Sequence, residues 1–294
     1  MEIRQLMYFI EVAEREHMSN AAEHLNVAQS AISRQISNLE DELGVLLFER
    51  AGRNVKILPA GEILLSHAKT IIEQLDQTKK HLAEYTSPDS GIINIGFPTS
   101  LATTLLPNII NAFSKEYPKI KFHLRQGSYL FLHESIKSRK FNLAFLGPVI
   151  LDDPSIKGDI LFVEKLLLLV PRSHRLVERE HVSMRTLRKE EFILFPKGYI
   201  LEKMVTDACH NEDFEPTITG EGEDLDAIKG MVAAGIGITV LPESAITGHE
   251  NIFLKCIPIQ NPLIERSVGM ITPQNRILTP SEKAFYQFVL DYFK

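Results

Sequence analysis

The sequence predicts a mixed α/β protein in three parts: a small helical N-terminal domain, one long helix, and a C-terminal region of two α/β lobes. Residues 1–60 carry short helical patterns followed by a hairpin pattern, and residues 61–85 carry one uninterrupted helical pattern. From residue 91 onward, apolar strand patterns alternate with helical patterns, which is typical of sheets covered by helices. A chain of 294 residues is long enough for two or three such compact units.

Composition and motifs exclude several classes of protein. The two cysteines, Cys209 and Cys256, lie far apart without metal-site spacing, so we expect neither a disulfide nor bound zinc. The amphipathic, acidic N-terminus is unlike a signal peptide and the apolar runs are short, so we expect a cytoplasmic protein without a membrane partner. The sequence has no phosphate-binding loop, zinc-protease motif or nucleophile elbow, so we expect no enzyme activity, no metal and no cofactor.

Residues 1–43 predict three short helices. The first is indicated by apolar residues at helical spacing, namely Ile3, Leu6, Phe9, Ile10 and Ala13. We expect Ser19 to cap a second helix, from Asn20 to Leu25, and Asn26 to turn the chain tightly, because asparagine accepts left-handed dihedral angles. A third helix is expected over residues 29–43. Its buried apolar stripe would consist of Ile32, Ile36, Leu39 and Leu43.

The opposite face of the third helix is polar, and its first half is free of acids. This face carries Gln29, Ser30, Ser33 and Arg34. Such short or forked side chains reach base edges and phosphates in the major groove of DNA. The formal net charge of −6 does not favour DNA binding, but the acids lie mainly on the first helix and beyond the second turn of the third. We therefore predict double-stranded DNA as a partner; the alternative is a small domain with ordinary solvated charges.

Residues 45–58 predict a β-hairpin, with two apolar strands on either side of a turn at residues 51–54. The basic residues of this hairpin are Arg50, Arg53 and Lys56. They would lie along the phosphate backbone as a basic wing. The three helices and the hairpin together predict a winged helix-turn-helix domain over residues 1–58.

The long helix and the segment after it, residues 59–90, predict a dimerisation linker followed by a hinge. Apolar residues in this helix follow alternating steps of four and three, which is the pattern of a coiled-coil seam. The seam residues are Leu64, Ala68, Ile71, Leu75 and Leu82. The pattern predicts a homodimer. The alternative is a single amphipathic helix that packs on its own domain.

Residues 91–294 predict a domain of two α/β lobes. The first strands are expected at residues 92–97, 120–127 and 141–147. Their alternation with helices predicts a parallel sheet with a binding site at the carboxyl ends of its strands. More strands and helices follow from residue 164, and a strand near Val268 crosses back before a final helix. The expected bounds are 91–162 and 266–294 for lobe I, and 163–265 for lobe II.

Polar residues at the ends of the first two strands predict a ligand site. Thr99 and Ser100 follow the first strand, and Ser128 follows the second, with Arg125 just before it. Free N–H groups and the helix dipole attract anions at such junctions. The alternative is that the serines only cap helices and that Arg125 is a solvated strand residue. The acidic run at residues 221–224 also precedes a helix, where the dipole favours acids; the alternative is a gate over the ligand cleft.

The N-terminal motifs resemble those of LysR-type transcriptional regulators. The stretch SNAAEHLNVAQSAISRQISNLEDELGVLLFERAGRNVKILPAG contains the family's Ala-Ala pair, the Gln-Ser start of its recognition helix and its Leu-Glu-x-x-Leu-Gly run. The resemblance implies groove contacts for the polar face of the third helix and backbone contacts for the basic wing. Leu58 departs from the family pattern, which usually has a threonine at this position.

The C-terminal lobes resemble the family's effector domain, which has the two-lobed architecture of periplasmic binding proteins. This implies a small-molecule effector between the lobes. The family's binding positions carry over to Ser100, Ser128, Pro148 and the turn that contains Lys197. The resemblance also implies a homodimer that pairs into a tetramer, an operator DNA with dyad symmetry, and RNA polymerase as a further partner.

Within the family, several stretches resemble members that activate glutamate synthase genes in Bacillus-type bacteria: IGFPTSLATTLLP, LRQGSY and GEGEDLDAIKGMVAAG. This implies control of glutamate biosynthesis, with 2-oxoglutarate and glutamate as opposing effectors. Such a dicarboxylate would require two helix N-termini and a cation such as Arg125 or Lys197. The alternatives are a regulator of another pathway that senses a different small carboxylate, a sensor that switches through its two cysteines, and a transport protein or enzyme that uses the same lobes.

Overall fold

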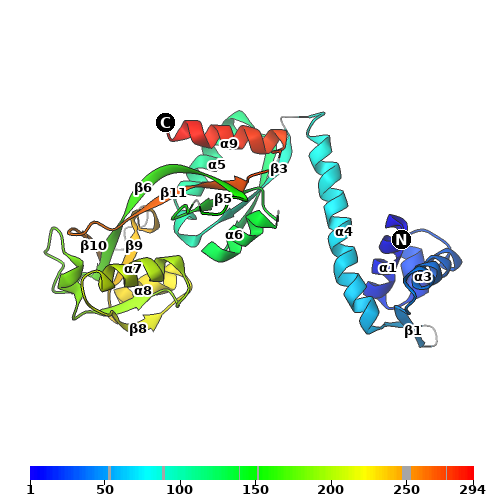
Figure 1. Cartoon of the computed structure of the whole chain (residues 1–294), viewed down its shortest axis with the longest axis horizontal. Coiled ribbons are helices and arrows are strands. Elements are labelled where there is room, and N and C mark those ends of the chain that lie inside the picture. Colours follow the sequence, from blue (N-terminus) through cyan, green and yellow to red (C-terminus); the bar gives the residue numbers. More distant parts are fainter. Residues whose placement is uncertain (52–53, 88–89, 139, 151, 247–252, 276) are drawn as a thin grey trace. The chain divides into compact units, whose positions relative to one another are not determined.

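The protein forms two compact units, Met1–Thr86 and Ser87–Lys294, in a computed structural model (Figure 1). The structure describes residues 1–51, 54–87, 90–138, 140–150, 152–246, 253–275 and 277–294. Across these residues, the helices are too short or too polar to span a membrane.

The N-terminal unit contains three short helices, a β-hairpin and one long helix. These are α1 (Ile3–Arg15), α2 (Met18–His24), α3 (Gln29–Leu43), β1 (Phe48–Ala51), β2 (Asn54–Ile57) and α4 (Pro59–Ala83). The predicted stripe of α3 is confirmed at Ile32, Ile36 and Leu39, which are buried in a core with Phe9 of α1. The prediction that Leu43 is a core residue is wrong. This residue is 40% exposed, because α3 ends there and Gly44 turns the chain away.

The turn between α2 and α3 has the predicted backbone conformation. Asn26 has a φ of 54°, in the left-handed region, and the Val27 amide donates to the Ala22 carbonyl at 3.0 Å. The predicted cap of α2 is wrong. Ser19 lies inside the helix, and His17 is the N-cap, whose Nδ1 accepts the Asn20 amide at 3.3 Å. The helix therefore begins two residues earlier than its sequence pattern indicates.

The hairpin is attached firmly to the helices. β1 and β2 are antiparallel, with Phe48 opposite Ile57, and the Val55 amide donates to the carbonyl of Glu16 at the end of α1 at 3.0 Å. The Glu40 carboxylate of α3 accepts the amides of Leu47 and Phe48 at 2.7 and 3.2 Å. The strands of the wing are thus held in register with α3.

The first half of α4 packs on its own unit. Ala68 is fully buried in the core, where α4 contacts α1, so its assignment to a dimer seam is wrong. Gly61 permits this packing, because a Cβ there would lie 2.4 Å from the Leu47 carbonyl oxygen. Leu58 occupies the N-cap position of α4 and offers no side-chain cap, as its departure from the family's threonine implies.

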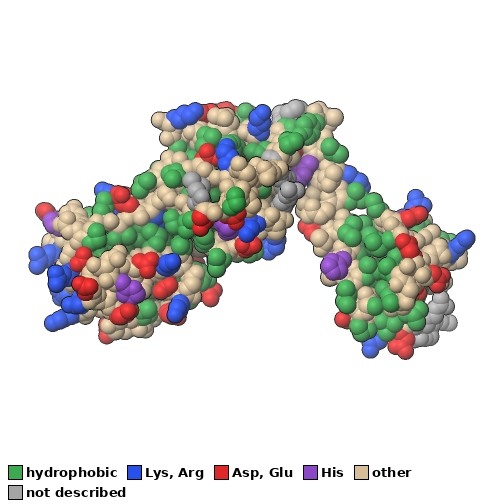
Figure 2. All heavy atoms as spheres, viewed as in Figure 1, with side chains coloured by type: hydrophobic (Ala, Val, Ile, Leu, Met, Phe, Trp, Pro, Cys, Tyr) green, Lys and Arg blue, Asp and Glu red, His purple; other side chains and the backbone are tan. Residues whose placement is uncertain are grey.

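Some apolar side chains of the N-terminal unit face solvent. Ile3 and Met7 of α1 and Ile63 of α4 are 47%, 47% and 64% exposed. Figure 2 shows hydrophobic side chains gathered on the visible face of this unit, around α1. Later in α4, the seam residues Ile71 and Leu82 are also exposed.

The C-terminal unit contains two lobes of strands and helices. Its elements are β3 (Gly91–Phe97), η1 (Thr99–Leu101), α5 (Leu105–Glu116), β4 (Ile120–Gln126), α6 (Tyr129–Lys137), β5 (Leu143–Leu146), β6 (Ile156–Pro171), η2 (Met184–Leu187), β7 (Glu191–Leu194), α7 (Ile200–His210), β8 (Thr217–Glu221), α8 (Leu225–Ala233), β9 (Thr239–Pro242), η3 (Glu243–Ala245), β10 (Leu254–Pro258), β11 (Glu265–Pro273) and α9 (Pro280–Tyr292). The predicted α/β fold class is confirmed. A short 3-10 helix, η1, follows β3 and precedes α5.

The main sheet is mixed rather than parallel throughout. Its strand order is β10-β6-β11-β5-β3-β4, and β9 also pairs with β6. β3 is parallel to β4 and β5, as predicted, but β11 is antiparallel to both β5 and β6. The reason is that β11 returns from the second lobe and enters the sheet from the opposite direction.

Helices cover both faces of the first lobe. On one face, α5 and α9 meet through Phe113 and Phe285, whose rings lie 5.1 Å apart edge to face. On the other face, α6 packs Leu132 and Ile136 against β5 and β11. The second lobe has its own core, in which α7 and α8 pack on β6, β7, β9 and β10.

Two long strands join the lobes (Figure 1). β6 starts at Ile156, eight residues before the strand pattern at residue 164, and pairs first with β11 and then with β9 and β10. The first half of β6 escaped prediction because Gly158 and Asp159 interrupt its apolar alternation. Both β6 and β11 therefore belong to both lobes.

Candidate functional site

The polar face of α3 is open to solvent. Gln29, Ser30 and Arg34 are exposed and Ser33 is half-buried, and all four lie within the first two turns of the helix. No acidic residue lies in the first turn. The N-cap, Ala28, has no side-chain cap hydrogen bond, so the first amides of α3 keep the capacity to bind an anion. The start of α3 therefore presents neutral hydrogen-bond donors and one guanidinium group to solvent.

The structure describes the basic wing in part. Lys56 of β2 is exposed and lies opposite Glu49 of β1. Arg50 lies in β1 at the register position opposite Val55. Arg53, the third predicted wing residue, falls outside the described residues.

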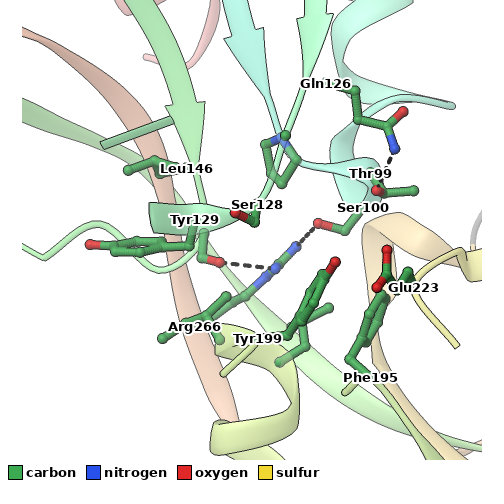
Figure 3. A pocket seen from close by; sticks show the side chains of 15 residues that line it. Thr99, Ser100, Gln126, Ser128, Tyr129, Leu146, Phe195, Tyr199, Glu223 and Arg266 are labelled. Carbon is green, nitrogen blue, oxygen red and sulfur yellow. Dashed lines mark hydrogen bonds between the residues drawn. The ribbon is translucent and has the colours of Figure 1, made fainter. Parts of the chain in front are cut away.

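A cavity of about 240 Å³ lies between the two lobes of the C-terminal unit (Figure 3). Lobe I lines it with residues at the carboxyl ends of β3, β4 and β5, and lobe II lines it with the turn after β7, the start of α7 and the loop after β8. Its lining residues are Pro98, Thr99, Ser100, Gln126, Gly127, Ser128, Tyr129, Leu146, Gly147, Phe195, Tyr199, Ile200, Leu201, Glu223 and Arg266.

Three of the predicted ligand residues, Thr99, Ser100 and Ser128, line this cavity. The other three do not. Arg125 is exposed on β4, next to the lining residue Gln126, and Lys197 is exposed in the turn between the lining residues Phe195 and Tyr199. Pro148 directly follows the lining residue Gly147. The cation that lines the cavity is therefore neither Arg125 nor Lys197, the two that the sequence suggested, but Arg266 of β11.

Arg266 is buried in an ion pair at the point where the two long strands cross between the lobes. It lies directly opposite Glu164 in the β6–β11 register, and its Nη2 and Nε lie 2.7 and 2.8 Å from Glu164 Oε1. The side chains of Arg266 and Glu164 are 1% and 5% exposed. Burial lowers the pKa of Arg266, and the Glu164 carboxylate opposes this by stabilising the charged guanidinium.

The other donors of Arg266 bind lobe I. Its Nη2 donates to Ser100 Oγ at 2.9 Å and its Nη1 donates to the Gly147 carbonyl at 3.1 Å (Figure 3). Ser244 of η3 closes the network, because its amide donates to Glu164 Oε2 at 2.8 Å and its hydroxyl to the Ser100 carbonyl at 3.1 Å. Four residues that are distant in the sequence thus form a closed hydrogen-bonded ring.

The two predicted serines have different roles. Ser100 is buried within η1, whose N-cap is Pro98, so the capping alternative is wrong for this residue. Ser128 is the N-cap of α6, because its Oγ accepts the Phe131 amide at 3.3 Å. Ser128 also lines the cavity, so it can cap α6 and contact a ligand at the same time. The start of α6, at Ser128 and Tyr129, therefore lies on the cavity wall.

The wall formed by lobe II is aromatic with one carboxylate. Phe195 stacks on Tyr199 with ring centroids 5.4 Å apart. Burial and the neighbouring Glu223 carboxylate raise the pKa of Tyr199. On the opposite wall, the Gln126 amide donates to Thr99 Oγ1 at 2.7 Å (Figure 3).

Sequence reasoning missed Glu164 and Arg266, although a signal for both exists. Each charged residue stands in phase with the fully buried positions of its strand: Glu164 with Leu166 and Leu168, and Arg266 with Val268 and Met270. A charge on the buried face of a strand requires a partner of opposite charge. The two residues satisfy each other across 102 positions of sequence.

The cysteines lie in different elements. Cys209 is buried in α7, and burial raises the pKa of its thiol to about 12. Cys256 is half-buried in β10. The Cys209 thiol carries little thiolate at neutral pH, which does not favour a redox switch at this residue. Among the residues that the structure describes, no cluster of His, Cys, Asp and Glu could hold a metal ion.

Comparisons with known families divide the chain at nearly the same place as the structure. Residues 3–62 match the bacterial regulatory helix-turn-helix protein model of the lysR family. Residues 86–294 match the LysR substrate binding domain.

Individual relatives are similar over most or all of their length. The chain is 53% identical over 293 residues to the transcriptional dual regulator GltC of Bacillus subtilis (strain 168), covering 100% of this chain and 98% of the relative. It is 30% identical to the DNA-binding transcriptional dual regulator OxyR of Escherichia coli (strain K12), covering 92% and 89%. Full-length CbnR in complex with its target DNA is similar in structure, with a TM-score of 0.75 and 26% identity over 98% of this chain and 99% of that one.

Proposed function

The chain belongs to the LysR family of bacterial transcriptional regulators, and we propose that it is a DNA-binding regulator controlled by a small-molecule effector. The observation that carries this proposal is that one chain contains both an exposed polar helix face without acids in its first turn and a polar cavity between two lobes. The effector acts by binding one arrangement of the lobes or subunits more tightly than another. The reader domain corresponds to residues 1–58, the linker to 59–90 and the effector domain to 91–294.

We propose that Gln29, Ser30, Ser33 and Arg34 contact base edges in the major groove. Their position at the start of α3 supports this, because the N-terminal residues of a recognition helix contact base edges in the major groove. Arg34 offers a planar fork that fits guanine. The wing residues Arg50, Arg53 and Lys56 would contact phosphates. The solved complex of the similar protein CbnR with its target DNA supports the same use of this domain.

We propose that α4 forms the dimer interface through Leu64, Ile71, Leu75 and Leu82. Ile71 and Leu82 are exposed large apolar residues on a helix of 25 residues, and exposed apolar residues at heptad spacing favour pairing with a second helix. Two readers would then bind a site with dyad symmetry. Pairing of dimers into a tetramer and contact with RNA polymerase complete the proposed assembly, which would act in the cytoplasm, at the chromosome.

The similarity to GltC supports a role in glutamate biosynthesis. We propose that the chain activates glutamate synthase genes and responds to 2-oxoglutarate and glutamate. The alternative is control of another pathway by a different small carboxylate. The cavity of about 240 Å³, with Arg266 and the start of α6 on its wall, has a size and polarity suited to a small carboxylate.

The proposal is tested by fluorescence anisotropy with the full chain. One duplex carries the region upstream of the glutamate synthase genes, and a second duplex of equal length has unrelated sequence, both at the same salt concentration. We expect tighter binding to the first duplex. Energy transfer between dyes at the two ends of this duplex should report a changed bend angle when 2-oxoglutarate or glutamate is added. Equal affinity for both duplexes would contradict sequence-specific DNA binding by this chain. An unchanged bend angle with both acids would contradict the proposal that 2-oxoglutarate and glutamate are its effectors.

A further inference from the structure

The two walls of the cavity differ in chemistry. This inference rests on the proposed function, in which the cavity binds the effector. Lobe I presents hydrogen-bonding groups from Thr99, Ser100, Gln126 and Ser128. Lobe II presents aromatic and aliphatic side chains and a single carboxylate, Glu223 (Figure 3). A ligand that spans the cavity therefore meets hydroxyls, amides and Arg266 at one end and an acid at the other.

The charges of the cavity do not favour a ligand with negative charges alone. Of the described residues that line it, two are charged, Arg266 and Glu223. Arg266 already has a buried carboxylate partner, Glu164, at 2.7 Å. The three charges together leave an excess of one negative charge. A second negative group on the ligand would lose its hydration without gaining an unpaired cation.

Glu223 belongs to the cavity rather than to the cap of the next helix. Asp224 is the N-cap of α8, because its Oδ1 accepts the amides of Asp226 and Ala227 at 2.8 and 3.1 Å. Glu223 instead lies near the Tyr199 hydroxyl, where its carboxylate raises the pKa of this tyrosine, and the Tyr199 ring stacks on Phe195. Both Tyr199 and Glu223 line the cavity on the lobe II side (Figure 3).

We propose that Glu223 is a specificity-determining residue that selects an α-amino acid over the corresponding 2-oxo acid. The ligand carboxylate binds at the lobe I side, near Arg266 and the first amides of α6. The ligand ammonium donates to the Glu223 carboxylate on the lobe II side. An amino acid thereby supplies the positive charge that the cavity lacks, whereas an oxo group provides no cation to pair with Glu223.

The two acids of the proposed pathway isolate this effect, because L-glutamate and 2-oxoglutarate differ only in the group on the α-carbon. Isothermal titration calorimetry of each acid into the full chain gives the two dissociation constants. We expect wild-type protein to bind L-glutamate at least about tenfold more tightly than 2-oxoglutarate. In the Glu223→Gln variant, which keeps the size of the side chain but removes its charge, the affinity for L-glutamate should fall about tenfold or more. The affinity for 2-oxoglutarate should stay the same or rise.

Glu221→Gln provides the matched control. Glu221 is an exposed residue of β8, two positions earlier and absent from the cavity lining, so this change removes the same charge from the same segment. It should leave both affinities within about twofold of wild type. An equal loss in the two variants would show a general effect of charge and overturn the assignment to Glu223.

The outcomes separate this inference from the proposed function. If 2-oxoglutarate binds at least as tightly as L-glutamate and Glu223→Gln changes neither constant, the selection for an ammonium group is wrong while the effector site stands. If neither these two acids nor other amino acid and 2-oxo acid pairs bind, the effector role and the inference are both overturned. Binding of an α-amino acid other than glutamate, weakened by Glu223→Gln, would support the inference and contradict the proposed pathway.

Discussion

The polar face of α3 and the cavity of the C-terminal unit place polar side chains in opposite environments. On α3, Gln29, Ser30 and Arg34 are solvated, and α3 requires none of them for its own core. At the cavity, the lining residue Arg266 and its ion-pair partner Glu164, which does not itself line the cavity, are almost fully buried and bind each other. Solvated side chains are free to bind a partner and contribute little to folding, whereas a buried ion pair is destabilising as soon as one member is removed. Substitutions in the two regions should therefore produce different kinds of defect.

The largest expected effect is on folding. Arg266→Ala should lower the free energy of unfolding of the C-terminal unit by about 3–5 kcal/mol, because Glu164 would keep a buried charge without its partner. Chemical denaturation followed by circular dichroism measures the loss, and hydrogen exchange shows which unit it affects. A double variant, Arg266→Met with Glu164→Leu, should recover most of the stability, since it removes both charges. Equal instability of the single and double variants would show that the charges are not the cause.

The second effect is on assembly. Leu82→Asp places a charge in the proposed dimer seam and should raise the dimer dissociation constant about 100-fold or more. Sedimentation equilibrium of the full chain measures this constant. Lys80→Asp is the control, because residue 80 lies on the opposite face of α4 and is exposed. Identical dissociation constants for wild type and the Leu82 variant would rule out this face of α4 as the interface.

The third effect is on DNA recognition. Arg34→Ala should weaken binding to the specific duplex by about 10- to 100-fold while leaving the unfolding transition unchanged, because Arg34 is exposed on α3 and its loss removes a base contact rather than a core contact. Arg179→Ala removes an exposed arginine from the C-terminal unit and should leave affinity unchanged. The ratio of affinities for specific and unrelated duplexes is the measurement. An unaltered ratio in the Arg34 variant would mean that α3 does not read bases through this residue.

The smallest effect separates capping from ligand binding at Ser128. Ser128→Ala should lower the free energy of unfolding by about 1 kcal/mol, because α6 loses its N-cap. Ser128→Asp keeps a capping oxygen and should restore stability, but its charge at the cavity wall should weaken carboxylate binding. Calorimetric titration and denaturation of the two variants distinguish these roles. If the aspartate variant binds carboxylates like wild type, Ser128 is a cap only.

The features that the sequence predicted well are local ones. The turn at Asn26 and the buried stripe of α3 depend on residues within one or two helical turns of each other, so spacing alone indicates them. The same holds for the positions of β3, β4 and α6, which placed Ser100 and Ser128 correctly at the ends of strands. In each case the physical cause lies in a few neighbouring residues.

The features that escaped prediction depend on distant partners. Arg266 became a cavity residue only because β11 returns beside β6 and brings it opposite Glu164. The heptad pattern in α4 could not distinguish a partner helix from the core of its own unit, and Ala68 belongs to that core. Likewise, His17 caps α2 through a ring nitrogen, a less common cap than the serine that the pattern favoured.

The position of β11 within the main sheet has a consequence for how the chain folds during synthesis. β11 lies between β5 and β6, yet it spans Glu265–Pro273, close to the end of the chain. Until this segment has left the ribosome, β5 and β6 each have a strand edge without its hydrogen-bonding partner. Glu164 likewise lacks the arginine with which it forms an ion pair. The N-terminal unit has no such dependence, since all its strands and helices come from Met1–Thr86. A nascent chain would thus carry a folded DNA reader well before its effector domain is complete.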